Sequence, residues 1–113
     1  MGAGKGRTAQ AVSLPVFWSD EAMAEFYDAE QWYADISPRL SQRFVQAVEN
    51  AVQLIAEFPL RFPVVYRERR RAAVRRFPYG LFYQIEADRI LLIACFHGKR
   101  NPLRWQGRQS FRS

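Results

Sequence analysis

The sequence predicts an α+β domain built from an N-terminal strand, an antiparallel helical hairpin and then a three-stranded antiparallel sheet. Between residues 20 and 58, apolar side chains recur every three or four positions, the period of a helix with one buried face. Beyond Pro63 the period becomes extended and ends in the apolar run Ile90–Phe96. The chain has 113 residues, 49% of them hydrophobic, which is enough for one packed domain and excludes a disordered protein.

The first predicted elements are a strand and a helix joined by a capping serine. Leu14–Trp18 is a short apolar, partly β-branched run, which indicates a strand. Ser19 can cap the following helix, and the acids Asp20 and Glu21 fall in its first turn, where the helix dipole favours them. This helix should end near Ile36. The apolar stripe on one of its faces consists of Ala22, Phe26, Ala29, Tyr33 and Ile36.

A second helix starts at Ser37-Pro38, with serine as the cap and proline in the first turn, where its missing N–H costs nothing. Pro59 stops this helix. We expect the two helices to form an antiparallel hairpin with facing apolar stripes, and Phe44 and Leu54 to lie between the hairpin and the sheet. The second stripe consists of Leu40, Phe44, Ala47, Ala51, Leu54 and Phe58.

The remaining elements are extended. Val64–Tyr66 and Ala72–Phe77 are the first candidates, and Pro78-Tyr79-Gly80 predicts a type I turn after them. Leu81–Glu86 and Ile90–His97 are separated by a span short enough for a hairpin. The last run has almost no polar alternation, so we expect a central strand covered on both faces. The helical hairpin should pack on one face of the twisted sheet.

Composition also limits the location and chemistry of the protein. No run approaches the roughly 18 apolar residues of a membrane span, and the N-terminus has no apolar signal segment. The single cysteine, Cys95, has no second thiol for an intramolecular disulfide or a zinc site. We therefore expect a cytoplasmic protein that uses no metal or other cofactor.

The net charge of +6 is unevenly distributed along the chain. Residues 17–60 carry eight acids and two bases, a net charge of −6. Residues 61–113 carry thirteen bases and three acids, a net charge of +10, and Lys5 and Arg7 complete the total. An acidic partner or a polyanion should therefore bind the C-terminal half.

Candidate functional residues lie in that half, and each has a structural alternative. His97 is the only histidine and a candidate for proton transfer, or else it closes the sheet by hydrogen-bonding to backbone. The arginine cluster suits RNA phosphate, an acidic segment of a partner protein, or the acidic helices of the protein itself. Trp105 lies in a tail without acids, which is either a contact surface or a solubilising end. The arginine cluster comprises Arg67, Arg69, Arg70, Arg71, Arg75 and Arg76.

The C-terminal half combines three motifs: the basic-Phe-Pro-Tyr turn at residues 75–79, the apolar strand Ile90–Phe96, and His-Gly-Lys-Arg-Asn-Pro at residues 97–102. The Trp-Ser-Asp-Glu-Ala entry at residues 18–22 and the Phe58-Pro59 helix ending accompany them. This arrangement resembles the ParE/RelE superfamily, the toxins of bacterial type II toxin-antitoxin modules, often labelled plasmid stabilisation proteins. The resemblance implies a toxin domain over residues 14–106. The small and polar residues at the N-terminus predict a flexible leader over 1–13, and the absence of acids at the C-terminus predicts a basic tail over 107–113.

The resemblance implies a protein that arrests growth and is neutralised by a cognate acidic antitoxin. ParE-like members inhibit DNA gyrase without enzymatic activity, whereas RelE-like members are ribosome-dependent mRNA endoribonucleases. The nuclease branch commonly has an arginine two residues before the aliphatic-Tyr pair of its third strand, and here Tyr79 or Gly80 takes that position. We therefore favour a non-enzymatic ParE-like toxin. The alternatives are the nuclease and a basic nucleic-acid-binding domain without toxicity.

Two sets of site residues follow from these interpretations. If the protein is a nuclease, the catalytic group is His97, Arg100, Arg76 and Tyr83. The antitoxin- or target-binding set is Arg69, Arg70, Arg71, Arg75, Arg76, Lys99, Arg100 and Trp105.

Overall fold

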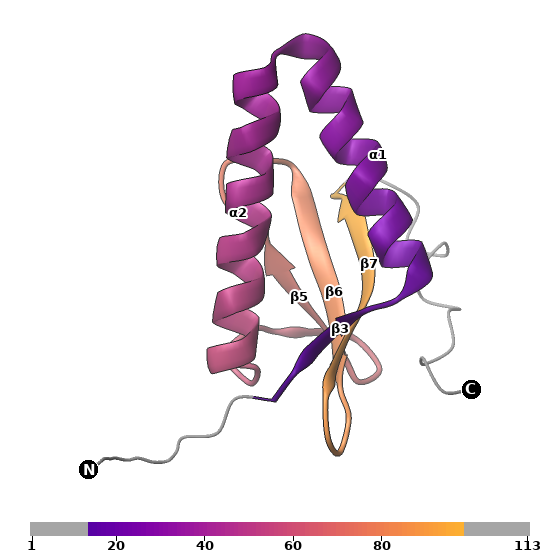
Figure 1. Cartoon of the computed structure of the whole chain (residues 1–113). Coiled ribbons are helices and arrows are strands. Elements are labelled where there is room, and N and C mark those ends of the chain that lie inside the picture. The colour runs from indigo at the N-terminus through magenta and orange to yellow at the C-terminus, as the bar shows by residue number, and fades with distance from the viewer. Residues whose placement is uncertain (1–13, 99–113) are drawn as a thin grey trace.

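In the computed structural model, which describes residues 14–98, two antiparallel helices lie over one face of a sheet (Figure 1). The predicted α+β class, N-terminal strand and helical hairpin are therefore confirmed. The elements are β3 Val16–Trp18, α1 Asp20–Ile36, α2 Pro38–Glu57, β4 Val64–Tyr66, β5 Arg69–Ala73, β6 Tyr79–Ile85 and β7 Ile90–His97. Neither helix in this part of the chain combines the length and the apolar character that crossing a membrane requires.

The helix boundaries follow the predicted caps. The Ser19 hydroxyl accepts a hydrogen bond from the Ala22 N–H at 3.1 Å, so one free amide at the start of α1 has a partner. The Ser37 hydroxyl accepts from the Leu40 N–H at 3.4 Å, and Pro38 is the first residue of α2. Both starts could be predicted because each depends on local sequence alone.

The sheet is larger than predicted. It has five strands in the order β3-β7-β6-β5-β4, where the sequence predicted an N-terminal strand and three more. β3 pairs in parallel with β7, whereas the other neighbours are antiparallel. β7 is an interior strand between β3 and β6, and its residues from Ile90 to Phe96 are all buried, as its unbroken apolar run predicted.

The boundaries between residues 69 and 80 were predicted incorrectly. The expected strand at Ala72–Phe77 is instead β5 at Arg69–Ala73, and the turn lies before Pro78 rather than at residues 78–80. Arg76 takes the left-handed conformation (φ 72°), which reverses the chain without a glycine. Tyr79 and Gly80 are therefore the first residues of β6. A run of arginines conceals the β5 signal, because long charged side chains replace the expected polar and apolar alternation.

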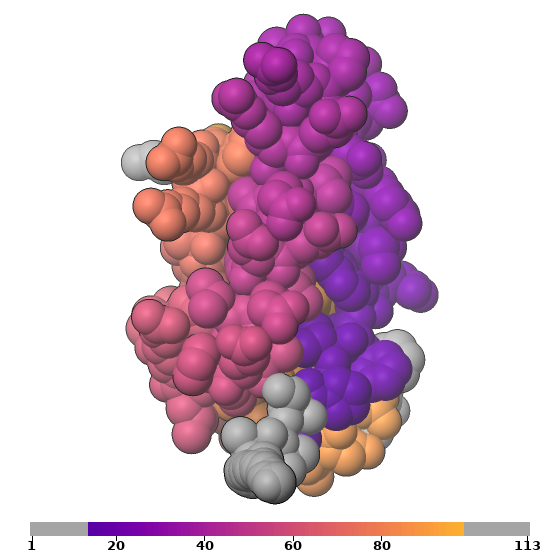
Figure 2. Space-filling view, turned by 60° about the vertical axis from the view of Figure 1, so that its left-hand side comes forward, coloured from indigo at the N-terminus to yellow at the C-terminus, as the bar shows by residue number. Residues whose placement is uncertain are grey.

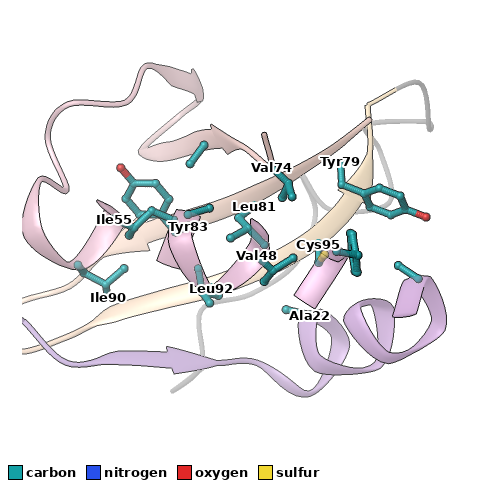
Figure 3. Close-up of a cluster of buried hydrophobic side chains, with 14 residues drawn as sticks. Ala22, Val48, Ile55, Val74, Tyr79, Leu81, Tyr83, Ile90, Leu92 and Cys95 are labelled. Carbon is teal, nitrogen blue, oxygen red and sulfur yellow. The ribbon is translucent and has the colours of Figure 1, made fainter. Parts of the chain in front are cut away.

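A β-bulge divides the buried residues of β7 between the two faces of the sheet. Tyr83 is opposite Leu92 but Phe82 is opposite Ala94, so Ile93 is the extra residue. The larger cluster faces the helices and includes Tyr83, Leu92 and Cys95 (Figure 3). The smaller cluster lies on the opposite face and consists of Phe82, Leu91, Ile93, Ala94 and Phe96.

The buried stripe of α2 is displaced by one position from part of the prediction. Phe44 and Ala51 are buried as expected, but Val48 and Ile55 take the places predicted for Ala47 and Leu54. Leu54 is 39% exposed, so the expectation that it lies between hairpin and sheet is wrong. Ile36, at the end of α1, is 61% exposed and is likewise no core residue. Neighbouring helix positions differ by about 100° around the axis. Where both neighbours are apolar, as in α2, the spacing alone does not decide which of the two is buried.

Candidate partner-binding groove

An open groove runs between α2 and the end of β5. The edge strand β4 pairs only with Arg69 and Arg70, so the C-terminal half of β5 has no outer strand beside it. In Figure 2 the turn after β5 stands beside α2, and the groove lies between these two elements. We call this feature the α2–β5 groove. Its apolar residues are Leu40, Ala47, Ala51, Leu54, Ala73 and Phe77, and its polar residues are Arg43, Gln46, Asn50, Gln53, Arg75 and Arg76.

The charge of the α2–β5 groove is positive. Arg43 on α2 and Arg75 and Arg76 in the turn are exposed, and no acidic side chain is among the lining residues. The groove thus joins an apolar floor to three guanidinium groups, which bind carboxylates through two parallel hydrogen bonds. Arg43, Leu40 and Ala47 were not predicted as site residues. Leu40, Ala47 and Leu54 were predicted as part of the apolar core stripe of α2, but they line the floor of the groove. The apolar spacing of α2 therefore contained part of the groove as well as part of the core.

The structure separates the predicted arginine cluster into distinct environments. Arg70 faces the helices and donates hydrogen bonds to the carbonyl oxygens of Leu60 at 3.3 Å and Phe62 at 2.6 Å. It therefore holds the segment between α2 and β4. Arg69 is buried on the opposite face, where its Nε donates to Gln84 Oε1 at 3.4 Å. Burial lowers the pKa of Arg69 from its ordinary value. Arg71 shares the face of Arg69, whereas Arg75 and Arg76 line the α2–β5 groove.

The residues proposed for nuclease chemistry do not all meet. Tyr83 is fully buried, and its hydroxyl donates to the Pro59 carbonyl oxygen at 2.5 Å. Burial raises the pKa of Tyr83 to about 12, so the phenol stays protonated at neutral pH. His97 is opposite Tyr79. Tyr79 precedes Tyr83 by four residues on β6, so His97 lies about 13 Å along the strand from Tyr83. Figure 3 shows Tyr79 and Tyr83 at opposite ends of the core cluster.

His97 does share one end of the sheet with the turn that carries Arg76. The Gly98 N–H donates to the Pro78 carbonyl oxygen at 2.7 Å, which ties the end of β7 to the start of β6. The His97 ring packs edge-on against Tyr79, with 5.5 Å between ring centroids. Lys99, Arg100 and Trp105 were predicted for this region but lie outside the described residues, as do the leader and the basic tail.

Acidic residues of α1 approach His97 from the other side. Glu25 and Asp28 line a small hollow with Trp32 and His97, and Glu25 Oε1 accepts a hydrogen bond from the Cys95 N–H at 3.0 Å. This bond gives the edge of β7 a partner beyond the point where β3 ends. Within residues 14–98, no three His, Cys, Asp or Glu side chains are grouped as metal ligands would be. Burial and the neighbouring Glu25 raise the pKa of the Cys95 thiol to about 12, so it is not a reactive thiolate.

Comparisons with known proteins identify the family. One solved structure, the chromosomal ParDE TA system from P. aeruginosa, superposes with a TM-score of 0.67 at 16% sequence identity. The match covers 75% of this chain and 96% of that chain, and it establishes a shared fold. No curated protein sequence matches the chain. Residues 16–102 match the family described as the ParE toxin of the type II toxin-antitoxin system, parDE. The chain therefore belongs to the ParE toxin family.

Proposed function

We propose that this toxin inhibits DNA gyrase without cleaving RNA, and that an acidic antitoxin segment silences it by occupying the α2–β5 groove. The main support for antitoxin binding is the composition of this groove. Leu54 and Phe77 contribute to its apolar floor, which lies beside three guanidinium groups, those of Arg43, Arg75 and Arg76. A segment with apolar side chains on one side and carboxylates on the other matches that surface.

Charge and burial have different roles in this binding. The exposed guanidinium groups attract an acidic segment from a distance, which speeds association and makes its rate sensitive to salt. Contacts with Leu40, Ala47 and Leu54 form only after docking, and they slow dissociation. A segment that is unfolded when free can follow the groove along α2 and the open half of β5.

The non-enzymatic mechanism is supported by the state of the residues that a nuclease would need. The Tyr83 hydroxyl is buried and already donates to Pro59. The position at which the nuclease branch has an arginine is taken by Tyr79 or Gly80, both of which are buried. Tyr79 packs among the aromatic rings of Tyr33 and Phe44, so it contributes to the core.

Gyrase inhibition and RNA cleavage can be tested with the same purified full-length chain. We expect inhibition of gyrase supercoiling, and induced expression should arrest growth while primer extension finds intact messages. Adding the cognate antitoxin should restore supercoiling. Codon-positioned cuts that disappear in His97→Ala would contradict the proposal and support the nuclease alternative.

The groove is tested with matched arginine variants. Arg76→Glu should weaken antitoxin binding, whereas Arg61→Glu, which makes the same change of charge, should not. Arg61 is also exposed, but its guanidinium lies 5.5 Å from the centre of the Phe58 ring, outside the groove. Equal affinities of the two variants would place the antitoxin elsewhere.

A further inference from the structure

The Arg71 side chain packs over an aromatic ring on the sheet face opposite the helices. It is opposite Phe82, a member of the buried cluster on that face, and its guanidinium carbon lies 5.8 Å from the centre of the Phe82 ring. Gly80 leaves the space for this arrangement. A Cβ atom added at Gly80 would lie 2.5 Å from Arg71 Nε and 2.7 Å from its Cζ. A side chain at position 80 would therefore force the end of the Arg71 side chain to move, whereas the backbone itself does not require glycine, because the φ angle of Gly80 is not positive.

Within residues 14–98, the guanidinium of Arg71 has no hydrogen-bond or ion-pair partner. Its side chain interacts there with the face of the Phe82 ring. Its neighbour Arg69 differs, because Arg69 donates to Gln84, and Gln84 in turn donates to Glu86. Glu86 also lies 4.0 Å from Arg89. Glu86 is thus engaged with Gln84 and Arg89, and the guanidinium donors of Arg71 are left for another group. The Arg71 side chain is half-buried against the Phe82 ring, so it has already lost part of its rotamer freedom, which lowers the cost of binding an anion through its guanidinium donors.

We propose that Arg71 binds a carboxylate of the protein that the toxin inhibits, on the sheet face opposite the helices. One guanidinium fork matches one carboxylate in a bidentate pair. Nucleic acid is the poorer match, because phosphate-backbone binding depends on several cations together. On this face Arg69 is buried and bonded to Gln84, so Arg71 is the arginine of β5 that remains available. The identity of the inhibited protein rests on the proposed function, but the anion site does not.

Anion binding can be measured directly by NMR on the full-length toxin. We would follow the Nε–H signals of Arg71 and Arg61 while adding sodium acetate, sodium phosphate or sodium chloride at matched ionic strength. Acetate should move the Arg71 signal in a saturable way and leave Arg61 unchanged. In Gly80→Ala the response should be lost although the guanidinium is still present, because the added methyl displaces it. Equal responses of the two arginines, or a stronger response of Arg71 to phosphate, would overturn the proposal.

A functional measurement then tests whether the site contacts the inhibited protein. Arg71→Gln and Gly80→Ala should each raise the toxin concentration needed for half-inhibition of gyrase by about tenfold or more, the effect of losing a charge-assisted pair. Arg61→Gln is the matched control, because it removes the same charge from another arginine that lies over an aromatic ring. If the parent toxin inhibits gyrase and Arg71→Gln inhibits it equally well, the proposed contact of Arg71 is refuted, but the proposed function is not. A parent that leaves gyrase active would refute the proposed function, and the acetate titration would still decide the anion site.

Discussion

Leu54 and Ile55 form a matched pair for separating binding from stability. They are adjacent on α2 and have the same side-chain composition, but Leu54 is 39% exposed in the α2–β5 groove whereas Ile55 is fully buried. Ile55→Ala should lower the free energy of unfolding by about 2–5 kcal/mol, because it removes apolar contacts and leaves a cavity. Leu54→Ala removes about three methylene equivalents that are only partly buried, so the cost should be about 1.5 kcal/mol or less.

Only one of the two changes should affect antitoxin binding. Leu54→Ala removes part of the groove floor, so it should raise the dissociation rate of the complex several-fold. Ile55→Ala should leave binding by the remaining folded protein almost unchanged, because the Ile55 side chain faces the sheet and not the groove.

Both effects are accessible with purified toxin. Urea denaturation gives the free energies of unfolding, and a surface-immobilised antitoxin gives the rate constants. A thermal scan should show a drop of about 4–8 °C in Tm for each kcal/mol lost. Equal destabilisation by the two variants would refute the assignment of the α2 faces. A normal dissociation rate for Leu54→Ala would remove this residue from the binding surface.

Four other outcomes are expected. Tyr83→Phe should lower the free energy of unfolding by about 1 kcal/mol, because it removes the hydrogen bond to the Pro59 carbonyl. Burial raises the pKa of Tyr83 to about 12, so its stabilising contribution is complete below about pH 10 and is lost as the pH rises toward 12. Over this range the free energy of unfolding, measured by urea denaturation at several pH values, should fall less for Tyr83→Phe than for the parent. Maleimide should label Cys95 only in denaturant, because the thiol is buried and its pKa is raised to about 12; labelling of the native protein at the free-thiol rate would contradict this. Arg75→Glu with Arg76→Glu should slow antitoxin association at low salt and flatten its salt dependence, which stopped-flow mixing at two salt concentrations can measure.

The sequence was most informative where one short segment determines the outcome. Ser19 and Ser37-Pro38 determine the helix starts through hydrogen bonds to residues three positions later. β7 was predicted with its observed bounds because an interior strand must be apolar on both faces. β5 was misplaced because its position depends on partners distant in the sequence, with Arg70 bound to the carbonyls of Leu60 and Phe62 and Arg71 over Gly80.

The candidate site was predictable in its charge but not in its shape. The excess of arginine in the C-terminal half indicated an acidic partner, and Arg75 and Arg76 do line the groove. The participation of Arg43 depends on the packing of α2 beside β5, which spacing along either element cannot reveal. The different environments of Arg69, Arg70 and Arg71 likewise follow from strand alternation in a β5 whose boundaries were misplaced.

Strand alternation in β5 places Arg71 close to the α2–β5 groove but on the opposite face from Arg70. Arg70 contacts the segment after α2, whereas Arg71 points to the opposite face of the sheet, so adjacent residues serve different surfaces. The α2–β5 groove begins at Ala73, only two residues beyond Arg71 on the same strand, a distance of about 7 Å. An antitoxin segment bound along this edge of β5 therefore lies close enough to obstruct a large protein at Arg71 without touching the guanidinium itself. Neutralisation would then be steric, and a small anion such as acetate should still reach Arg71 in the toxin-antitoxin complex. Loss of the acetate response in the complex would instead show that the antitoxin covers Arg71 directly.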